Sequence, residues 1–312
     1  MDCISNVVAL SRCQSYERKV LRMELGRLIE VLDLPALSSV DRVLLKPNLI
    51  SVKHGTLACT EAAFILAVAE LFVEKGIKVS LGDSPAFGTA HHALGKLGIV
   101  EPLHRLGVEI VEFKKAVPVE LASGVRLGIA REVLESDFMI NIPRVKAHGQ
   151  LRMTMAVKNC FGCVVGMRKP WLHMAHGGVH GRFAELLTEL LDVLPPTLSL
   201  LDGVVAMHKT GPIRGSEFPL GIIGGSLNPV ALDSTFYQIL GVAHRSVPLW
   251  WACFHAGKKG VDLEDLVFPL LHPGDIVVQN FESPAQLAPI RFRPLQFIRN
   301  GIKRLFLSQP WR

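Results

Sequence analysis

The chain has 312 residues, of which 49% are hydrophobic and 20% charged, with a formal net charge of +6. This length and apolar content predict one large domain, or two closely packed ones, with a sizeable buried core. No uninterrupted run of about 18 apolar residues occurs and the N-terminus lacks a signal-peptide pattern, so we expect a cytoplasmic protein with mostly reduced cysteines.

Short apolar runs alternate with helical patterns along most of the chain, which is typical of a largely parallel sheet covered by helices. Helices are predicted from Ser15 to about Leu34, from Thr60 to Lys75 and over 181–193, with Ser15 and Thr60 as N-caps. Strands are predicted at 7–10, 42–50, 78–81, 109–113, 137–142, 198–201, 220–223 and 275–279.

The predicted fold class is therefore α/β, a doubly wound, largely parallel sheet with helices on both faces. Residues 1–290 are expected to form a single α/β domain, in which 144–195 is either part of the same unit or an inserted lobe. Residues 291–312 form a separate basic amphipathic tail.

The tail has apolar and basic residues on opposite helical faces. Leu295, Ile298 and Ile302 share one face, and Arg299 and Lys303 lie opposite. Packing onto the protein's own core is the commoner fate of such a helix, and peripheral membrane contact through 294–312 is the alternative.

Polar residues follow three of the predicted strands, and ligands of open α/β sheets bind beyond the carboxyl ends of strands. We therefore expect a site for a small anionic ligand there. Its predicted substrate-binding residues are Lys46, Asn48, Asp83, Ser84, Lys146 and Thr154. For Lys46, a purely structural salt bridge to Asp83 is the alternative, because a lysine inside an apolar strand is costly to bury alone.

The predicted catalytic residues are His148, Lys158 and Asn159. Imidazole titrates near physiological pH, which suits His148 to general acid/base work, and the Asn159 amide could stabilise a developing oxyanion. Lys158, together with Lys46 and Lys146, is expected to gather positive charge in one cleft, suited to a carboxylate or phosphate. A solvated basic face is the alternative for Lys158.

Three histidines, His173, His176 and His180, are spaced so that a helix would place them on one face. With Asp202 they form a candidate site for a divalent metal, although nearby glycines weaken a helix there. Cys160 and Cys163 form a CxxC pair, but without a second such pair two buried thiols are the better interpretation. No ferredoxin-type motif encodes an iron–sulfur cluster.

Seven motifs occur in a fixed order: LLKPN, GDSP, NIPRVKAH, TMAVKNCFG, HMAH, LLDGVVAM with TGP, and NPVALD. This order, from about Arg42 to Gly241, resembles the domain of unknown function 362 family. The matching residues are Lys46, Pro47, Asn48, Gly82, Asp83, Pro143, Lys146, His148, Thr154, Lys158, Asn159, Gly162, Gly166, His173, Asp202, Gly203, Gly211, Pro212 and Asp233.

Many members of that family carry an appended ferredoxin module, so the resemblance implies a link to iron–sulfur or redox chemistry. This chain lacks the module and has Cys160 where relatives usually have an aliphatic residue. A cluster role would therefore need a ferredoxin-like redox partner.

The sequence favours an enzyme acting on a small anionic organic substrate in a Lys/His/Asn-lined cleft, with or without a divalent metal. The alternative is a metal or iron–sulfur handling protein that works with a ferredoxin-like partner. Nucleic-acid binding is disfavoured, because aromatic residues make up only 7% of the chain and no known binding motif occurs.

Overall fold

The structure is a computed structural model that describes residues 6–32, 34, 40–53, 55–86, 88–165 and 182–287. Its centre is a sheet with the strand order β1-β12-β10-β7-β2-β3-β4. These strands are β1 (Ala9–Arg12), β12 (Ile222–Ser226), β10 (Thr197–His208), β7 (Phe138–Ile142), β2 (Arg42–Pro47), β3 (Lys78–Asp83) and β4 (Glu109–Glu112). Neighbours from β10 to β4 are parallel, whereas β12 and β1 are added antiparallel at one edge. The predicted α/β class is confirmed.

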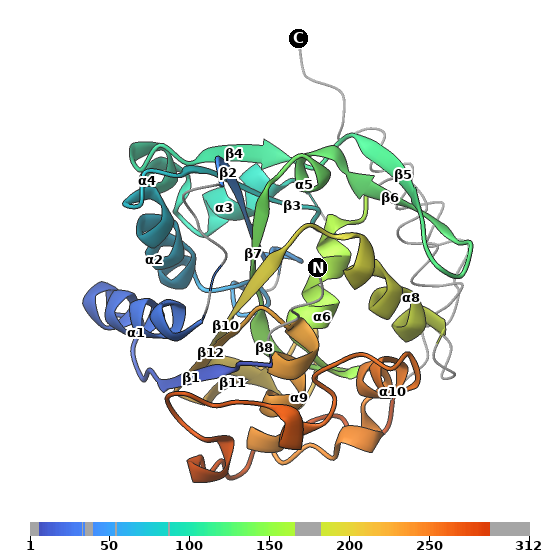
Figure 1. Ribbon diagram of the computed structural model, residues 1–312. Helices are drawn as coiled ribbons and strands as arrows, with labels where there is room; N and C mark the ends of the chain where they lie inside the picture. Colours follow the sequence, from blue (N-terminus) through green and yellow to red (C-terminus); the bar gives the residue numbers. More distant parts are fainter. Residues whose placement is uncertain are drawn as a thin grey trace.

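Helices cover both faces of the sheet, as predicted (Figure 1). One face carries α1 (Arg18–Val31), α2 (Ala62–Val73), α3 (Ala90–Lys96) and α4 (Val100–Arg105). The other carries α5 (Arg131–Leu134), α6 (Ala156–Asn159), α8 (Arg182–Leu190), α9 (Pro229–Ile239) and α10 (Pro248–His255). None of these described helices has the length and apolar run that a bilayer crossing requires.

The central strands are apolar on both sides because each side packs against helices. In β2, Val43 and Leu45 belong to the core beneath α1 and α2, whereas Leu44 belongs to the core beneath α6 and α9. This two-sided burial makes Lys46, the next residue of β2, exceptional: it is 0% exposed.

Short strands extend the sheet beyond the end of β7. β8 (Arg144–His148) pairs parallel with the second half of β10 and antiparallel with β9 (Arg152–Thr154). β11 (Ser216–Pro219) pairs with β10, and β5 (Ala116–Glu120) forms a hairpin with β6 (Arg126–Ala130). Single turns of 3₁₀ helix lie at Cys160–Cys163, Leu191–Val193, His244–Ser246, Leu263–Asp265 and Pro273–Asp275.

Three local predictions are wrong. Ser15 does not cap α1, whose N-cap is Glu17; the Ser15 hydroxyl accepts from Glu17 N at 3.0 Å, before the helix begins. The apolar run at 275–279 is not a strand: the 3₁₀ turn Pro273–Asp275 leads into it, Ile276 is buried in the core, Val278 packs partly against the core, and Val277 is 80% exposed. Thr60 does not cap α2, whose N-cap is Glu61. The Thr60 hydroxyl instead donates to Ile142 O at 2.6 Å, and this hydrogen bond connects the loop after β2 to the end of β7.

A candidate anion site at the switch point of the sheet

The direction of chain winding reverses between β2 and β7. The β2-to-β3 connection runs through α2 on one face, and the β7-to-β10 connection runs through α6 and α8 on the other (Figure 1). The carboxyl ends of the two strands lie side by side, with Lys46 opposite Asn141 and Pro47 opposite Ile142. In doubly wound sheets this switch point is where ligands bind.

Lys46 is held in a complete set of contacts. Its Nζ donates to Asp83 Oδ1 at 2.9 Å, to Pro47 O at 3.0 Å and to Asn159 Oδ1 at 3.3 Å. Because an ammonium has three N–H groups, all of them are used. The structure therefore has the Lys46–Asp83 salt bridge that the sequence left as an alternative, with both side chains buried.

A chain of amides extends from this ion pair into the sheet. The Asn159 amide donates to Asn141 Oδ1 at 2.8 Å and to Lys46 O at 3.3 Å. Asn141 in turn donates to Ser199 Oγ and to Ala156 O, both at 3.1 Å. Asn159 thus holds Lys46 in place through its bonds to the Lys46 ammonium and the Lys46 carbonyl. Asn141 was not among the predicted site residues, although an asparagine inside the apolar strand FMINI was a signal for it.

The start of α6 is fixed by a buried carboxylate on α9. Asp233 accepts from Ala156 N at 2.7 Å and from Val157 N at 3.1 Å. Burial raises the pKa of Asp233 to about 7, although the two backbone N–H groups oppose that shift. The carboxylate thus sets the position of α6 and, through it, of Asn159.

Gly162 lies directly against the ion pair. A Cβ built on this residue would overlap Asp83 Oδ1 and the Lys46 ammonium, neither of which can swing aside because both are buried and paired. The 3₁₀ turn Cys160–Cys163 therefore needs glycine here in order to close over the pair.

We expect Gly162→Ala to lower the free energy of unfolding by about 3 kcal/mol, because it overpacks a buried ion pair. Gly149→Ala is the matched control, since its Cβ would meet only Gly211 O at 3.7 Å. Urea denaturation of both variants measures the difference, and equal midpoints would show that the turn does not press on the pair.

Lys146, on β8, is buried without a carboxylate partner. Its Nζ donates to Ala58 O at 2.7 Å and to Asn48 Oδ1 at 3.0 Å, both neutral acceptors. It is 1% exposed, and burial lowers the pKa of its amine to about 7. When protonated, Lys146 has one N–H more than these two contacts use.

Thr154 lies directly opposite Lys146 in the β8–β9 pair, so the two side chains share one face of the ribbon. Its hydroxyl is buried and has no hydrogen-bond partner among the described residues. Asn48, which accepts from Lys146, is only half-buried and is therefore more exposed than Lys146 and Thr154. The remaining predicted substrate-binding residue, Ser84, follows Asp83 at the end of β3 and is also half-buried.

His148 lies two residues beyond Lys146 on β8 and is 5% exposed. Its Nδ1 accepts from Gln150 N and from Leu151 N, both at 3.1 Å. The proton of the neutral ring is therefore on Nε2. A base role at Nε2 would require a proton on Nδ1, which faces two N–H donors.

Asp202 is fully occupied by contacts within the protein. Its Oδ1 accepts from the Tyr16 hydroxyl at 2.8 Å and its Oδ2 from Glu61 N at 3.1 Å, and Arg144 Nε lies 3.8 Å away. Burial raises the pKa of Asp202, while Arg144 and the Tyr16 hydroxyl act in the opposite direction. These contacts hold the start of α2 against β8 and β10, which is a structural role. Nothing in the sequence around Tyr16 indicated that it belongs to this network.

The proposed metal ligands His173, His176 and His180 lie outside the described residues. Within the part of the chain that the structure describes, no group of three or more His, Cys, Asp or Glu side chains could hold a metal ion. Cys160 and Cys163 are buried free thiols, as expected, and burial raises the pKa of Cys160.

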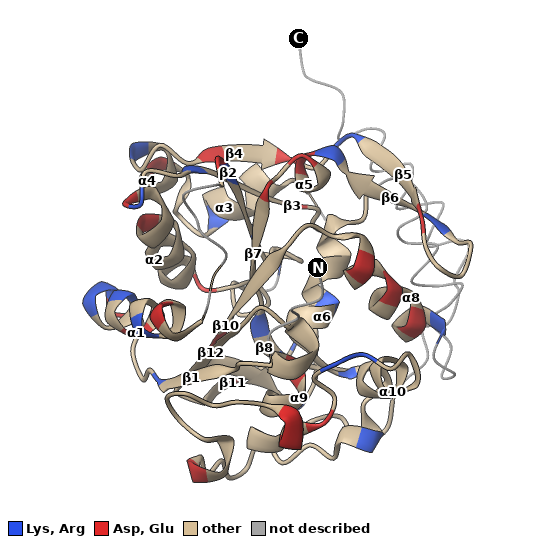
Figure 2. Ribbon diagram, in the orientation of Figure 1, with Lys and Arg blue, Asp and Glu red and all other residues tan. Residues whose placement is uncertain are grey.

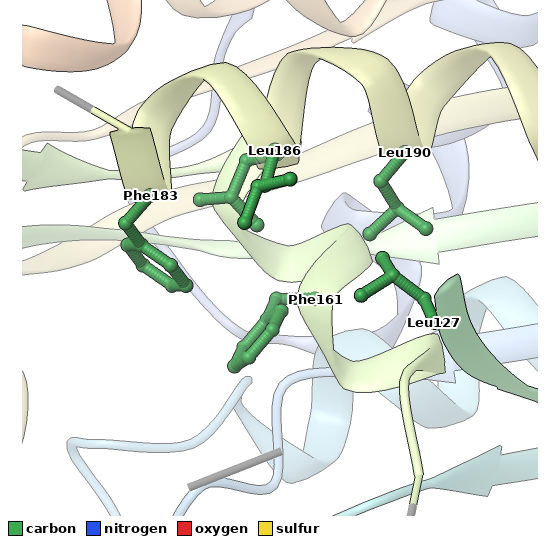
Figure 3. A pocket seen from close by; sticks show the side chains of 6 residues that line it. Leu127, Phe161, Phe183, Leu186 and Leu190 are labelled. Atoms are coloured by element: carbon green, nitrogen blue, oxygen red, sulfur yellow. The ribbon is translucent and has the colours of Figure 1, made fainter. Parts of the chain in front are cut away.

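Lys158 lies on another side of α6 from Asn159. Its ammonium is 4.9 Å from the ring centre of Phe161 and 5.6 Å from that of Phe183, which are cation–π contacts. The two rings help to line a small apolar pocket, where they face Leu127, Leu186 and Leu190 (Figure 3). The described contacts thus place Lys158 beside this pocket, and the pocket offers no polar group to orient a ligand.

Charged residues lie mostly on the outer helices, and basic segments also occur inside the molecule on β8 and α6 (Figure 2). The sequence had suggested that Lys46 and Lys146 line an open cleft. They are 0% and 1% exposed, so within the described chain they line no open surface. They share instead a buried polar centre in which Asp83 and neutral oxygens separate the cations.

Fold and site together define a doubly wound α/β protein with a buried, lysine-containing polar centre at its switch point. The profile of the family described as domain of unknown function (DUF362) matches residues 43–238, and the chain belongs to this family. A thylakoid-associated protein of Synechocystis sp. is 38% identical over 304 residues, which cover 96% of this chain and 94% of that protein.

Two solved structures have a weaker likeness in fold. A Thermotoga maritima protein has a TM-score of 0.37 at 11% identity and covers 70% of this chain. The lactate racemase apoprotein of Thermoanaerobacterium thermosaccharolyticum has a TM-score of 0.44 at 9% identity and covers 75%. This chain spans 57% of the length of each of them.

Proposed function

We propose that the protein is an enzyme acting on a small anionic organic substrate, which binds at the switch point against Lys146. The observation that carries this proposal is a buried lysine without a carboxylate partner on the same face of the β8–β9 ribbon as a buried hydroxyl that has no hydrogen-bond partner among the described residues. Both groups are costly to bury in this state, and one anion would satisfy both.

In this proposal each residue of the site has a separate role. Lys146 and Thr154 hold the anionic group, and His148 serves as the general acid. Lys46 contributes positive potential while it remains bonded to Asp83 and Asn159, so it stabilises charge without moving. Lys158 would reinforce the positive field from beside the apolar pocket.

The test is a thermal-shift series with phosphate, sulfate and small carboxylates at constant ionic strength. A bound anion stabilises the native state by mass action, by about 1.4 kcal/mol at ten times its dissociation constant, so the wild type should gain a few degrees. Lys146→Met should lose the response. The control Lys19→Met, which removes an equal charge from an exposed position of α1, should keep it.

A third variant, Lys158→Ala, asks whether that lysine belongs to the same site. A lost response with unchanged stability would place it there. A wild type that no anion stabilises, or a Lys146→Met protein that responds like the wild type, would contradict the proposed function.

We further propose that the protein is cytoplasmic and associates peripherally with membranes through residues 294–312. The thylakoid association of a 38% identical relative supports the membrane contact, as does the amphipathic pattern of the segment. Full-length protein should sediment with vesicles containing anionic lipid, less so at high salt, and deletion of 294–312 should abolish the binding. Equal binding of the full-length and truncated proteins would refute this.

A further inference from the structure

The fully buried charges around Lys146 are paired with one another, and none of them is a carboxylate bonded to Lys146. Lys46 is paired with Asp83 at 2.9 Å, and Arg144 is paired with Asp202 at 3.8 Å, with all four side chains nearly or fully buried. Lys146 has no buried carboxylate partner. One negative charge that binds together with a proton on Lys146 would therefore leave the centre neutral, whereas a second negative charge would be in excess.

The other titratable neighbours do not supply that charge. Cys59, in the loop after β2, is buried, and burial raises the pKa of its thiol, so it stays neutral. Glu61 lies 3.4 Å from Arg144, and its side chain is 30% exposed and thus partly screened by water. Within the described chain, the hydrogen bonds of Lys146 go to neutral oxygens alone.

The number of free donors also limits the ligand. Lys146 offers one N–H beyond its two bonds, and Thr154 offers one O–H from the facing strand. Two donors match the two oxygens of a carboxylate. Lys146 and Thr154 supply no donors for the further oxygens of a sulfate or phosphate dianion.

From this balance we propose that Lys146 and Thr154 form a subsite for one carboxylate group, which binds together with one proton that Lys146 takes up. This inference rests on the proposed function and names its substrate class as carboxylic acids. In the empty site the amine is kept neutral by desolvation, which is consistent with its lowered pKa. The arriving carboxylate favours the ammonium, so the bound pair is Lys146-NH₃⁺ with carboxylate⁻ and the proton comes from solvent.

The experiment follows the lysine side chains by carbon NMR in protein labelled at lysine Cε, with acetate as the probe. Lys146→Met assigns the resonance of Lys146. In the free protein this resonance should titrate near neutral pH, and 100 mM acetate should move its midpoint upward by at least one pH unit. Sulfate at the same ionic strength should move it less.

Thr154→Val keeps the size of the side chain and removes the donor. We expect it to weaken acetate binding about tenfold, because a hydrogen bond to a charged group is lost. Acetate that perturbs the spectrum in a Lys146-dependent way without moving the titration midpoint would overturn the proton uptake and leave the proposed function standing. A stronger effect of sulfate would overturn the carboxylate class. No response to acetate would overturn this inference, and no response to any of these anions would overturn the proposed function with it.

Discussion

Asp83→Asn is expected to lower the free energy of unfolding by about 3–5 kcal/mol. The substitution leaves the Lys46 ammonium buried at 0% exposure with neutral acceptors alone, and an uncompensated buried charge is among the costliest defects in a protein core. The measurement is the urea midpoint at neutral pH, with the slope of the transition checked for two-state behaviour.

The control for this variant is a surface ion pair of the same length. Arg126 and Glu120 lie 2.8 Å apart but are 72% and 56% exposed, so Glu120→Gln should change stability by less than about 1 kcal/mol. If Asp83→Asn fails to fold, the double variant Lys46→Met, Asp83→Asn should recover stability because no charge remains buried. Equal small losses for Asp83→Asn and Glu120→Gln would show that the buried pair does not hold the switch point.

Lys146→Met should change how stability depends on pH. The pKa of Lys146 is about 7 in the folded protein, against an ordinary value of 10.5, so between these values the unfolded chain binds a proton that the native chain lacks. Stability of the wild type therefore gains up to about 1.4 kcal/mol per pH unit from this group as pH rises through the window, and loses it as pH falls. The methionine variant lacks this contribution.

The comparison is made as a difference between the two proteins. Buried thiols such as Cys160 and Cys253, whose pKa is raised by burial, act in the opposite direction at alkaline pH but are present in both. The gap in unfolding free energy should move by about 2 kcal/mol between pH 8 and pH 10 in favour of the wild type. Parallel curves would mean that Lys146 is charged in the native protein.

The sequence was sufficient for the central strands and for the meeting of their polar ends. The runs at 42–50 and 137–142 are apolar enough to be buried on both faces, and a parallel sheet then brings their carboxyl ends together. This reasoning correctly joined Lys46 to Asp83, although it left open whether their contact was structural.

The part that sequence reasoning missed depends on tertiary pairing. The sequence pattern predicts Arg144, Lys146 and His148 to be polar residues that follow the end of a strand. They lie instead in a strand of their own, β8, and all three side chains are buried. Only the partners supplied by distant segments, such as Tyr16 for Arg144 and Ala58 for Lys146, make that burial tolerable. Such partners leave no local periodicity in the sequence.

The contrast between the two buried lysines is the central feature of the site. Lys46 has a carboxylate and a full set of acceptors, and its expected role is fixed and structural. Lys146 has neither, and it lies beside an unused hydroxyl at the switch point. Stability should therefore depend chiefly on Lys46, and anion binding on Lys146.

The most direct test of this account is a crystal structure of the full chain grown at pH 6 and soaked in acetate. Lys146 is charged at that pH, and the account predicts planar density with one oxygen within hydrogen-bond distance of Lys146 Nζ and the other within reach of Thr154 Oγ1. A single ordered water joining these two atoms, with no anion between them at saturating acetate, would contradict the assignment of this site as an anion site.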